Sequence, residues 1–175
     1  MDGATRRITT TTVGTASNTQ TSERGPGVSV PPTVAYAAGF GLAWWFHQIM
    51  PLPVDVEGSV IRTILGWSLV GVGTALFIWA LRIFFVVRTG IMLQKPATSL
   101  MMAGPYAWSR NPQYIAFSAM YAGAALIGNT LWPFILLPAV LLIVGGGVIA
   151  REERYLHATF GDSYADYCRR VGRWF

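Results

Sequence analysis

Residues 104–114 read GPYAWSRNPQY, and they lead into forty residues, 111–150, that contain no charged side chain. Proline has no backbone N–H and disfavours helix at the residue before it, so Asn111-Pro112 predicts a turn followed at once by a helix. One helix of that length would extend roughly 60 Å, about twice the thickness of the hydrocarbon core of a membrane. The run must therefore fold back on itself, which leaves Arg110 on a turn at the mouth of a membrane segment.

The one good turn signal inside the uncharged run is Gly128-Asn129-Thr130. It predicts a helical hairpin with arms at about 113–127 and 131–150. The first arm is short for a full crossing, so we expect it to lie obliquely or to be shielded by its neighbours.

The second arm carries two kinds of residue that disturb a helix. Pro133 falls in its first turn, where proline is tolerated, whereas Pro138 should kink it. Gly145-Gly146-Gly147 should allow another helix, or a cofactor, to approach the backbone closely.

Two more apolar stretches precede the hairpin, at about 33–50 and 59–87. Gly66, Gly71 and Gly73 in the second should allow close helix packing, on which lipid-embedded helices depend. The composition, 53% hydrophobic and 12% charged, is that of an integral membrane protein. We therefore predict an all-α integral membrane protein whose single domain, 33–175, has four transmembrane helices at about 33–50, 59–87, 113–127 and 131–150.

The two ends of the chain differ in composition. Residues 1–32 are rich in Thr, Ser, Gly and Pro and poor in large apolar residues, which predicts a disordered tail. Residues 151–175 carry an apolar stripe at helical spacing. They predict two short amphipathic helices that lie on the membrane surface and cover the loop, with Gly161 ending the first and Asp162 capping the second. The stripe consists of Leu156, Phe160, Tyr164, Tyr167, Val171 and Phe175.

Charge predicts the orientation of the helices. Asp55 and Glu57 lie in the loop after the first helix, whereas most cationic residues fall on the other side. The positive-inside rule makes that side cytoplasmic, and four crossings place both termini there. We expect the inner (plasma) membrane of a bacterium. The cationic residues on this side are Arg82, Arg88, Lys95, Arg110, Arg151, Arg154, Arg169, Arg170 and Arg173.

Several functions are excluded on composition. The net charge of +5 is modest and follows the membrane ends, so nucleic acid is not expected as a partner. Cys168 is the single cysteine, which rules out an internal disulfide and a multi-thiolate metal site, and we expect it to be passive. His47 and His157 lie too far apart in sequence to suggest a metal ligand pair. Trp108 and Trp132 are expected to be interfacial anchors.

A resemblance rests on an ordered set of motifs. GPYAWSRNPQY, the apolar hairpin, REERYL (151–156) and HATFGDSYADYCRRV (157–171) follow one another. Over residues 89–173 this set resembles the isoprenylcysteine carboxyl methyltransferases and the related phospholipid methyltransferases, in the form of a bacterial-type member. The resemblance implies a membrane enzyme that transfers a methyl group from S-adenosylmethionine to a lipid-like or small apolar acceptor. The acceptor atom would belong to a carboxylate, an amine or a thiol.

The resemblance also implies roles for individual residues. Arg110 and Glu153 would be catalytic, with Arg110 either orienting the acceptor or binding the cofactor carboxylate. Eukaryotic members have histidine where this chain has Asn111, and asparagine cannot become cationic near neutral pH, which weakens the case for a prenylcysteine substrate. The implied cofactor contacts come from Gly104, Pro105, Tyr106, Asn111, Tyr114, Glu152 and Glu153.

The chemistry of these side chains supports the same interpretation. Carboxylates suit an ammonium or ribose hydroxyls, and aromatic faces suit adenine or a nearby positive charge.

The alternative is a non-enzymatic membrane protein, such as a small transporter subunit or an assembly factor. A transporter would be expected to carry charge deep in a helix, but residues 63–81 and 111–150 carry none. The glycine-rich faces leave open whether helices pack within one chain or between two.

Overall fold

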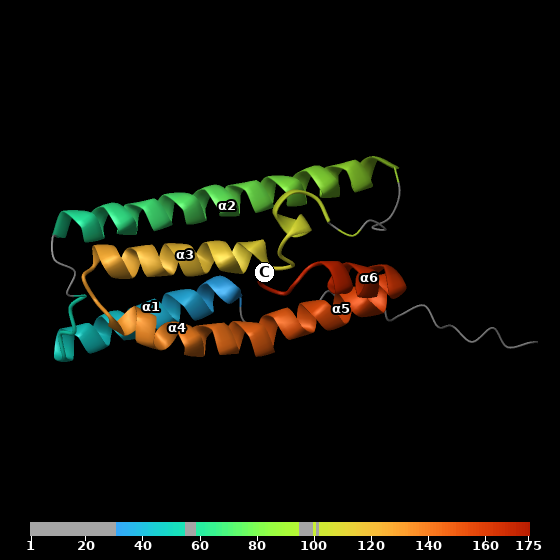
Figure 1. Cartoon of the computed structure of the whole chain (residues 1–175). Coiled ribbons are helices and arrows are strands. Elements are labelled where there is room, and N and C mark those ends of the chain that lie inside the picture. The colour runs from blue at the N-terminus through green and yellow to red at the C-terminus, as the bar shows by residue number, and fades with distance from the viewer. Residues whose placement is uncertain (1–30, 55–58, 95–99, 101) are drawn as a thin grey trace, which may run out of the picture.

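The computed structural model describes residues 31–54, 59–94, 100 and 102–175, and the regular secondary structure in this part is all helical, as the predicted all-α class requires (Figure 1). The tail 1–30, the acids Asp55 and Glu57, and Lys95 lie outside the described residues, as does the side chain of Arg88. The helices are α1 (Pro32–Ile49), α2 (Ser59–Gln94), the 3-10 turn η1 (Gly104–Ala107), α3 (Pro112–Ile127), α4 (Trp132–Ile143), the π-helix η2 (Val144–Ile149), α5 (Ala150–Phe160) and α6 (Asp162–Arg170).

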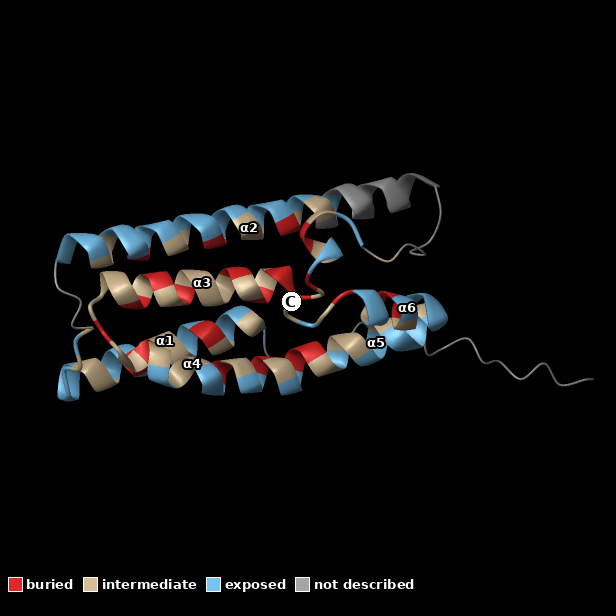
Figure 2. Ribbon diagram, viewed as in Figure 1, coloured by how far each residue is buried: buried red, intermediate tan, exposed pale blue. Residues whose placement is uncertain are grey.

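The four long helices pack in two pairs, α2 along α3 and α1 along α4 (Figure 1). Helix α3 lies between the others and has no exposed residue, while the outer face of α2 is exposed (Figure 2). This agrees with the expectation that the short first arm of the hairpin is shielded. One end of the bundle carries η1, α5 and α6, and most of the side chains that the sequence predicted as a site gather there.

Two helical stretches in the described part are long and apolar enough to cross a membrane, Ser59–Ile83 and Trp132–Phe160. Only 17% and 28% of their most apolar windows are buried inside the protein, whereas the core helix of a soluble protein is mostly buried. Their exposed apolar surface is suited to lipid. At 18 and 16 residues, α1 and α3 are shorter than the roughly 20 residues that a full crossing needs. Four crossings therefore stay a prediction.

The predicted turns at both ends of α3 are confirmed. Asn111 precedes the helix with φ −131°, and Pro112 is its first residue. At the far end Asn129 has φ 50°, a left-handed conformation that asparagine tolerates. Its side-chain oxygen accepts the N–H of Val54 at 3.1 Å, and the N–H of Leu131 donates to Leu52 at 2.9 Å. The hairpin turn is thus tied to the connection that follows α1.

Close packing at glycines is confirmed at two of the predicted positions. A β-carbon on Gly66 or on Gly73 would press on the backbone of α3, so both glycines are required by the α2–α3 contact. The prediction was wrong for Gly71, because a β-carbon there would meet nothing within 4 Å. The prediction of close helix packing at Gly145, Gly146 and Gly147 was also wrong, because a β-carbon at any of these positions would meet nothing within 4 Å.

The predicted disturbance of the second hairpin arm takes a particular form. Pro138 lies inside α4, which continues beyond it to Ile143. The chain then widens into the π-helix Val144–Ile149, which contains the three glycines, and runs directly into α5. A π-helix has hydrogen bonds from residue i to i+5, so each turn contains more residues than a turn of α-helix. Such segments are often found at functional sites. Here it lies immediately before Glu152 and Glu153.

The amphipathic helices after residue 150 are confirmed as α5 and α6. Gly161 separates them with φ 51°, as predicted for a helix end. The prediction of Asp162 as an N-cap was wrong, because Gly161 is the cap residue and Asp162 is the first residue of α6, with no side-chain cap. Most of the apolar stripe packs inward as one cluster, but Phe175 is 86% exposed and does not belong to it. The cluster contains Tyr164, Tyr167 and Val171, with Leu100, Leu156, Phe160 and Cys168 packed against it.

Candidate functional site

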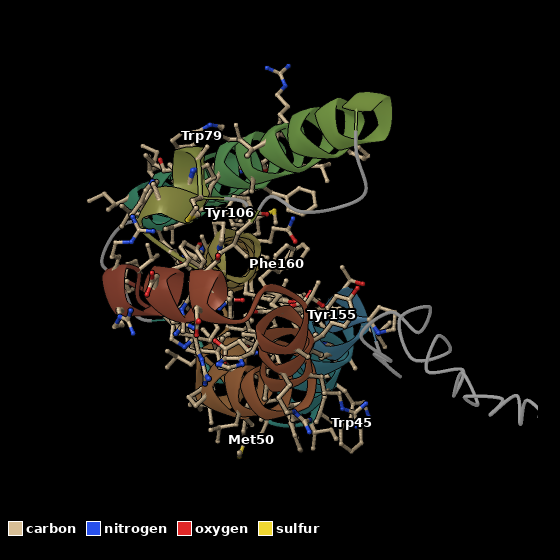
Figure 3. The ribbon with its side chains drawn as sticks, turned by 90° about the vertical axis from the view of Figure 1, so that its right-hand side faces the viewer. Trp45, Met50, Trp79, Tyr106, Tyr155 and Phe160 are labelled. Atoms are coloured by element: carbon tan, nitrogen blue, oxygen red, sulfur yellow. The ribbon has the colours of Figure 1, made fainter. Side chains whose placement is uncertain are left out.

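A cavity of about 250 Å³ lies where η1, the start of α3, α5 and α6 meet. In the end-on view of Figure 3, Tyr106 lies between the η1 loop and the two last helices. The residues that line the cavity are mostly aromatic, acidic or amide-bearing, which is an unusual lining at the end of an apolar bundle. They are Tyr106, Arg110, Asn111, Pro112, Gln113, Tyr114, Glu152, Glu153, Tyr155, Leu156, Tyr164 and Tyr167.

Hydrogen bonds fix the loop that presents Arg110. The fully buried Ser109 accepts the backbone N–H of Asn111 at 3.1 Å through its hydroxyl oxygen, which shapes the turn before α3. The backbone N–H of Arg110 donates to the carbonyl of Gly172 at 3.0 Å. The side-chain amide of Asn111 donates to the carbonyl of Arg173 at 3.0 Å. The last residues of the chain therefore hold this loop in place.

The guanidinium of Arg110 joins three elements. Its Nη1 lies 3.0 Å from Oε1 of Glu153 on α5 and donates to Sγ of Cys168 on α6 at 2.8 Å. The Arg110 and Glu153 side chains are only 16% and 18% exposed, so solvent screens this ion pair less than a surface pair. Burial alone would lower the pKa of Arg110, but Glu153, Cys168 and Tyr164 outweigh it and raise the pKa. The side chain is a fixed positive charge.

One hydrogen-bond donor of Arg110 is unpaired. Its buried Nε–H has no hydrogen-bond partner within the described part of the protein. A buried unpaired donor costs about 1–3 kcal/mol, more on a charged group, so its presence needs an explanation. Because Arg110 lines the cavity, an oxygen of a bound molecule would supply the missing acceptor.

Glu152 is held by the first turns of α3. The hydroxyl of Tyr114 donates to its Oε2 at 3.1 Å. Tyr114 is itself 6% exposed, and its carbonyl accepts the hydroxyls of Tyr36 at 3.2 Å and of Ser118 at 2.8 Å. A half-buried carboxylate of this kind is a pairing position for a cation or for hydroxyl donors.

Three polar side chains fix the roof of the cavity. The amide of Gln113 donates to the hydroxyl of Tyr106 at 3.2 Å, and the hydroxyl of Tyr167 donates to the carbonyl of Tyr106 at 2.7 Å. Burial, reinforced by the charge of Glu152, raises the pKa of Tyr106 to about 12, so its hydroxyl stays protonated at neutral pH. The Tyr106 ring is thereby held as a neutral aromatic face.

The structure brings together around the cavity six of the eight residues that the sequence singled out as a site. Gly104 and Pro105 do not line the cavity. Gly104 has φ 61°, and a β-carbon there would press on Ile83 and Trp79 of α2, so this glycine docks the loop on the bundle. Its role as a cofactor contact stays a prediction. The six residues around the cavity are Tyr106, Arg110, Asn111, Tyr114, Glu152 and Glu153.

The residues at or near the cavity that were missed as site residues include Tyr164, Tyr167, Cys168 and Arg173. Tyr164 and Tyr167 were predicted only as part of an apolar stripe, yet both line the cavity. The expectation that Cys168 is passive was wrong, because its sulfur accepts from Arg110. Arg173 was treated as an orientation signal, yet it pairs with Glu153. Their helical spacing was visible in the sequence, but the direction that the stripe faces was not.

The chain matches the family described as phospholipid methyltransferase over residues 61–163, which is more than half of its length. The chain therefore belongs to the phospholipid methyltransferase family, which includes proteins like the isoprenylcysteine carboxyl methyltransferases, and this membership implies a membrane-associated methyltransferase. No curated protein and no solved structure matches the chain. The matched region includes Arg110, Glu152 and Glu153 but ends before Tyr164, Tyr167, Cys168 and Arg173.

Proposed function

We propose that this chain transfers a methyl group from S-adenosylmethionine to a lipid-like or small apolar acceptor at the cytoplasmic face of the inner (plasma) membrane of a bacterium. The single observation that carries the proposal is the cavity in which Arg110, Glu152 and Glu153 meet the faces of Tyr106 and Tyr114. These residues lie at two distant places in the sequence, and the hairpin brings them together. Membership of a methyltransferase family supplies the type of reaction.

The lining of the cavity suits the donor in its chemistry. S-adenosylmethionine supplies a methyl group on a cationic sulfur, and it also carries an ammonium, a carboxylate, a ribose and an adenine. Glu152 offers a carboxylate to the ammonium or to ribose hydroxyls, and the tyrosine rings offer faces to adenine or to positive charge. The unpaired Nε–H of Arg110 would donate a hydrogen bond to a carboxylate oxygen, either of the cofactor or of the acceptor.

The protein's own residues contribute by position and electrostatics. Glu153 and Cys168 hold Arg110 at a fixed place, so its orientation costs little when a second molecule binds. Tyr114 holds Glu152 in the same way. Methyl transfer is an in-line displacement, so alignment and exclusion of water account for most of the catalysis. The apolar helices next to the cavity give a lipid-like acceptor a route from the membrane.

The experiment is calorimetric binding of S-adenosylmethionine to the detergent-purified protein. We expect measurable affinity for the wild type and none for Glu152→Gln/Glu153→Gln, because glutamine keeps the shape but cannot pair with a cation. Asp162→Asn/Asp166→Asn on α6 is the matched control, since both acids are exposed and neither lines the cavity. Equal affinity in the wild type and the glutamine variant would contradict the assignment. Radiolabelled donor incubated with membranes would then identify the acceptor through the labelled lipid fraction.

A further inference from the structure

The closing segment, residues 171–175, returns from α6 toward the start of α3 (Figure 1). The carbonyl of Arg173 accepts the Asn111 amide at 3.0 Å and the Ser109 hydroxyl at 3.5 Å. Trp174 packs against the apolar core of the helical bundle. The segment curls so tightly that a β-carbon on Gly172 would collide with the backbone of Phe175. It is therefore an ordered part of the site.

The side chain of Arg173 reaches the acidic pair of the cavity. Its Nε donates to Oε1 of Glu153 at 3.1 Å, and its Nη2 pairs with Oε2 of the same carboxylate. Oε1 also lies 3.0 Å from Arg110, so both oxygens of Glu153 are engaged. A carboxylate that is proposed to help bind a cationic cofactor is thus already paired with a cationic side chain of its own chain.

Two further observations indicate that the ion pair between Arg173 and Glu153 can open. The Arg173 side chain is 44% exposed while Glu153 is 18% exposed, so the pair lies at the rim of the cavity and one partner faces solvent. The cavity of about 250 Å³ is smaller than the roughly 300–1,000 Å³ of ordinary small-molecule sites. S-adenosylmethionine is a large ligand for such a site, and a wider cavity would accommodate it better.

We propose that the closing segment is an autoinhibitory latch. In the closed form, Arg173 takes the cation position on Glu153 and the segment narrows the cavity. Its release frees Oε2 of that carboxylate, while Oε1 stays paired with Arg110, and enlarges the space, after which the cofactor can bind. The identity of the ligand rests on the proposed function above, whereas the opening of the latch is a property of the chain alone. The segment lies beyond the family match, which ends at residue 163.

Opening is measured without any ligand by hydrogen exchange. The backbone N–H of Arg110 donates to Gly172, so its exchange reports release of the segment. We expect Arg173→Gln to speed this exchange about fivefold, which corresponds to loss of one partly exposed ion pair of roughly 1 kcal/mol. The amides within α3 should keep the wild-type rate, which shows that the bundle is intact. Unchanged exchange at Arg110 in Arg173→Gln would overturn the latch.

Binding kinetics supply the second test. The association rate constant of S-adenosylmethionine, followed by stopped-flow tryptophan fluorescence, should rise about fivefold in Arg173→Gln for the same reason. Arg169→Gln is the matched control, because Arg169 is exposed and pairs with Asp166 away from the cavity. An unchanged or slower association, with binding retained, overturns the latch and leaves the proposed function standing. If neither wild type nor variant binds the cofactor, the proposed function fails, and hydrogen exchange still decides the latch.

Discussion

Gly66 of α2 and Gly123 of α3 lie back to back. A β-carbon on Gly123 would be 2.6 Å from the carbonyl oxygen of Gly66, and a β-carbon on Gly66 would be 2.9 Å from the carbonyl oxygen of Gly123. No ordinary side chain fits at either position. This contact brings the two helix backbones as close as they can come, and it sets the position of α3, whose first turns carry Tyr114.

The first prediction concerns this contact. Gly66→Ala should destabilise the protein by about 1–3 kcal/mol, because the added methyl group forces α2 away from α3. Gly71→Ala is the control in the same helix, since a methyl group there meets nothing, and it should be neutral or stabilise by up to about 1 kcal/mol. Thermal unfolding in detergent measures both. Equal unfolding temperatures for the two variants would contradict the packing argument.

The second prediction concerns the support of Glu152. Tyr114→Phe keeps the ring in the core but removes the hydroxyl that donates to Glu152. The affinity for S-adenosylmethionine should fall roughly tenfold, the value of one hydrogen bond to a charged group. Tyr121→Phe is a matched control, because its buried hydroxyl has no partner among the described residues. Titration calorimetry on both variants tests the difference, and a similar affinity for the two would refute the role of Tyr114.

The third prediction concerns the shape of the Arg110 side chain. Arg110→Lys keeps the charge but loses the planar group that contacts Glu153 and Cys168 and presents Nε to the cavity. The rate of methyl transfer should fall by about 10²–10³, as when one preorganised donor is removed from an active site. Arg169→Lys on the exposed face of α6 should keep the wild-type rate. Retention of full activity by Arg110→Lys would show that only its charge matters.

The fourth prediction concerns alkaline pH. Burial raises the pKa of Tyr106 and of Tyr167 to about 12, whereas an unfolded tyrosine titrates near about 10. Between these values the unfolded chain loses protons that the folded chain keeps, so the contribution of these two tyrosines to stability should be unchanged below about pH 10 and fall as the pH rises toward about 12. Thermal unfolding across this range measures the decline. It should be shallower in Tyr106→Phe, and an equally steep decline in that variant would exclude Tyr106 as a contributor.

The sequence predicted the features that depend on local backbone chemistry. Pro112 and Asn129 act on their own turns, and so the bounds of α3 and the reversal after it follow from residues close in sequence. The meeting of Arg110 with Glu153 also follows, because the two arms of a hairpin of similar length bring their ends together. In this case the topology alone is enough to place two side chains near one another.

The features that depend on the angle between elements were not predictable in this way. The stripe that includes Tyr164 and Tyr167 was expected to cover the loop, and it does, through the bond from Tyr167 to the carbonyl of Tyr106. Periodicity shows which residues share a face, but the direction of that face depends on how α6 packs. For that reason Cys168 and Arg173 were not recognised as neighbours of Arg110 and Glu153.

The π-helix Val144–Ile149 determines the direction in which Glu152 and Glu153 point. Each residue of an α-helix advances by roughly 100° around the axis, so one residue gained or lost upstream rotates everything after it by that angle. Deletion of Gly146 would tighten the turn toward ordinary pitch and swing Glu152 and Glu153 away from the tyrosines. The protein would then lose the cavity through a rotation about the helix axis, with every residue that lines it still present in the sequence.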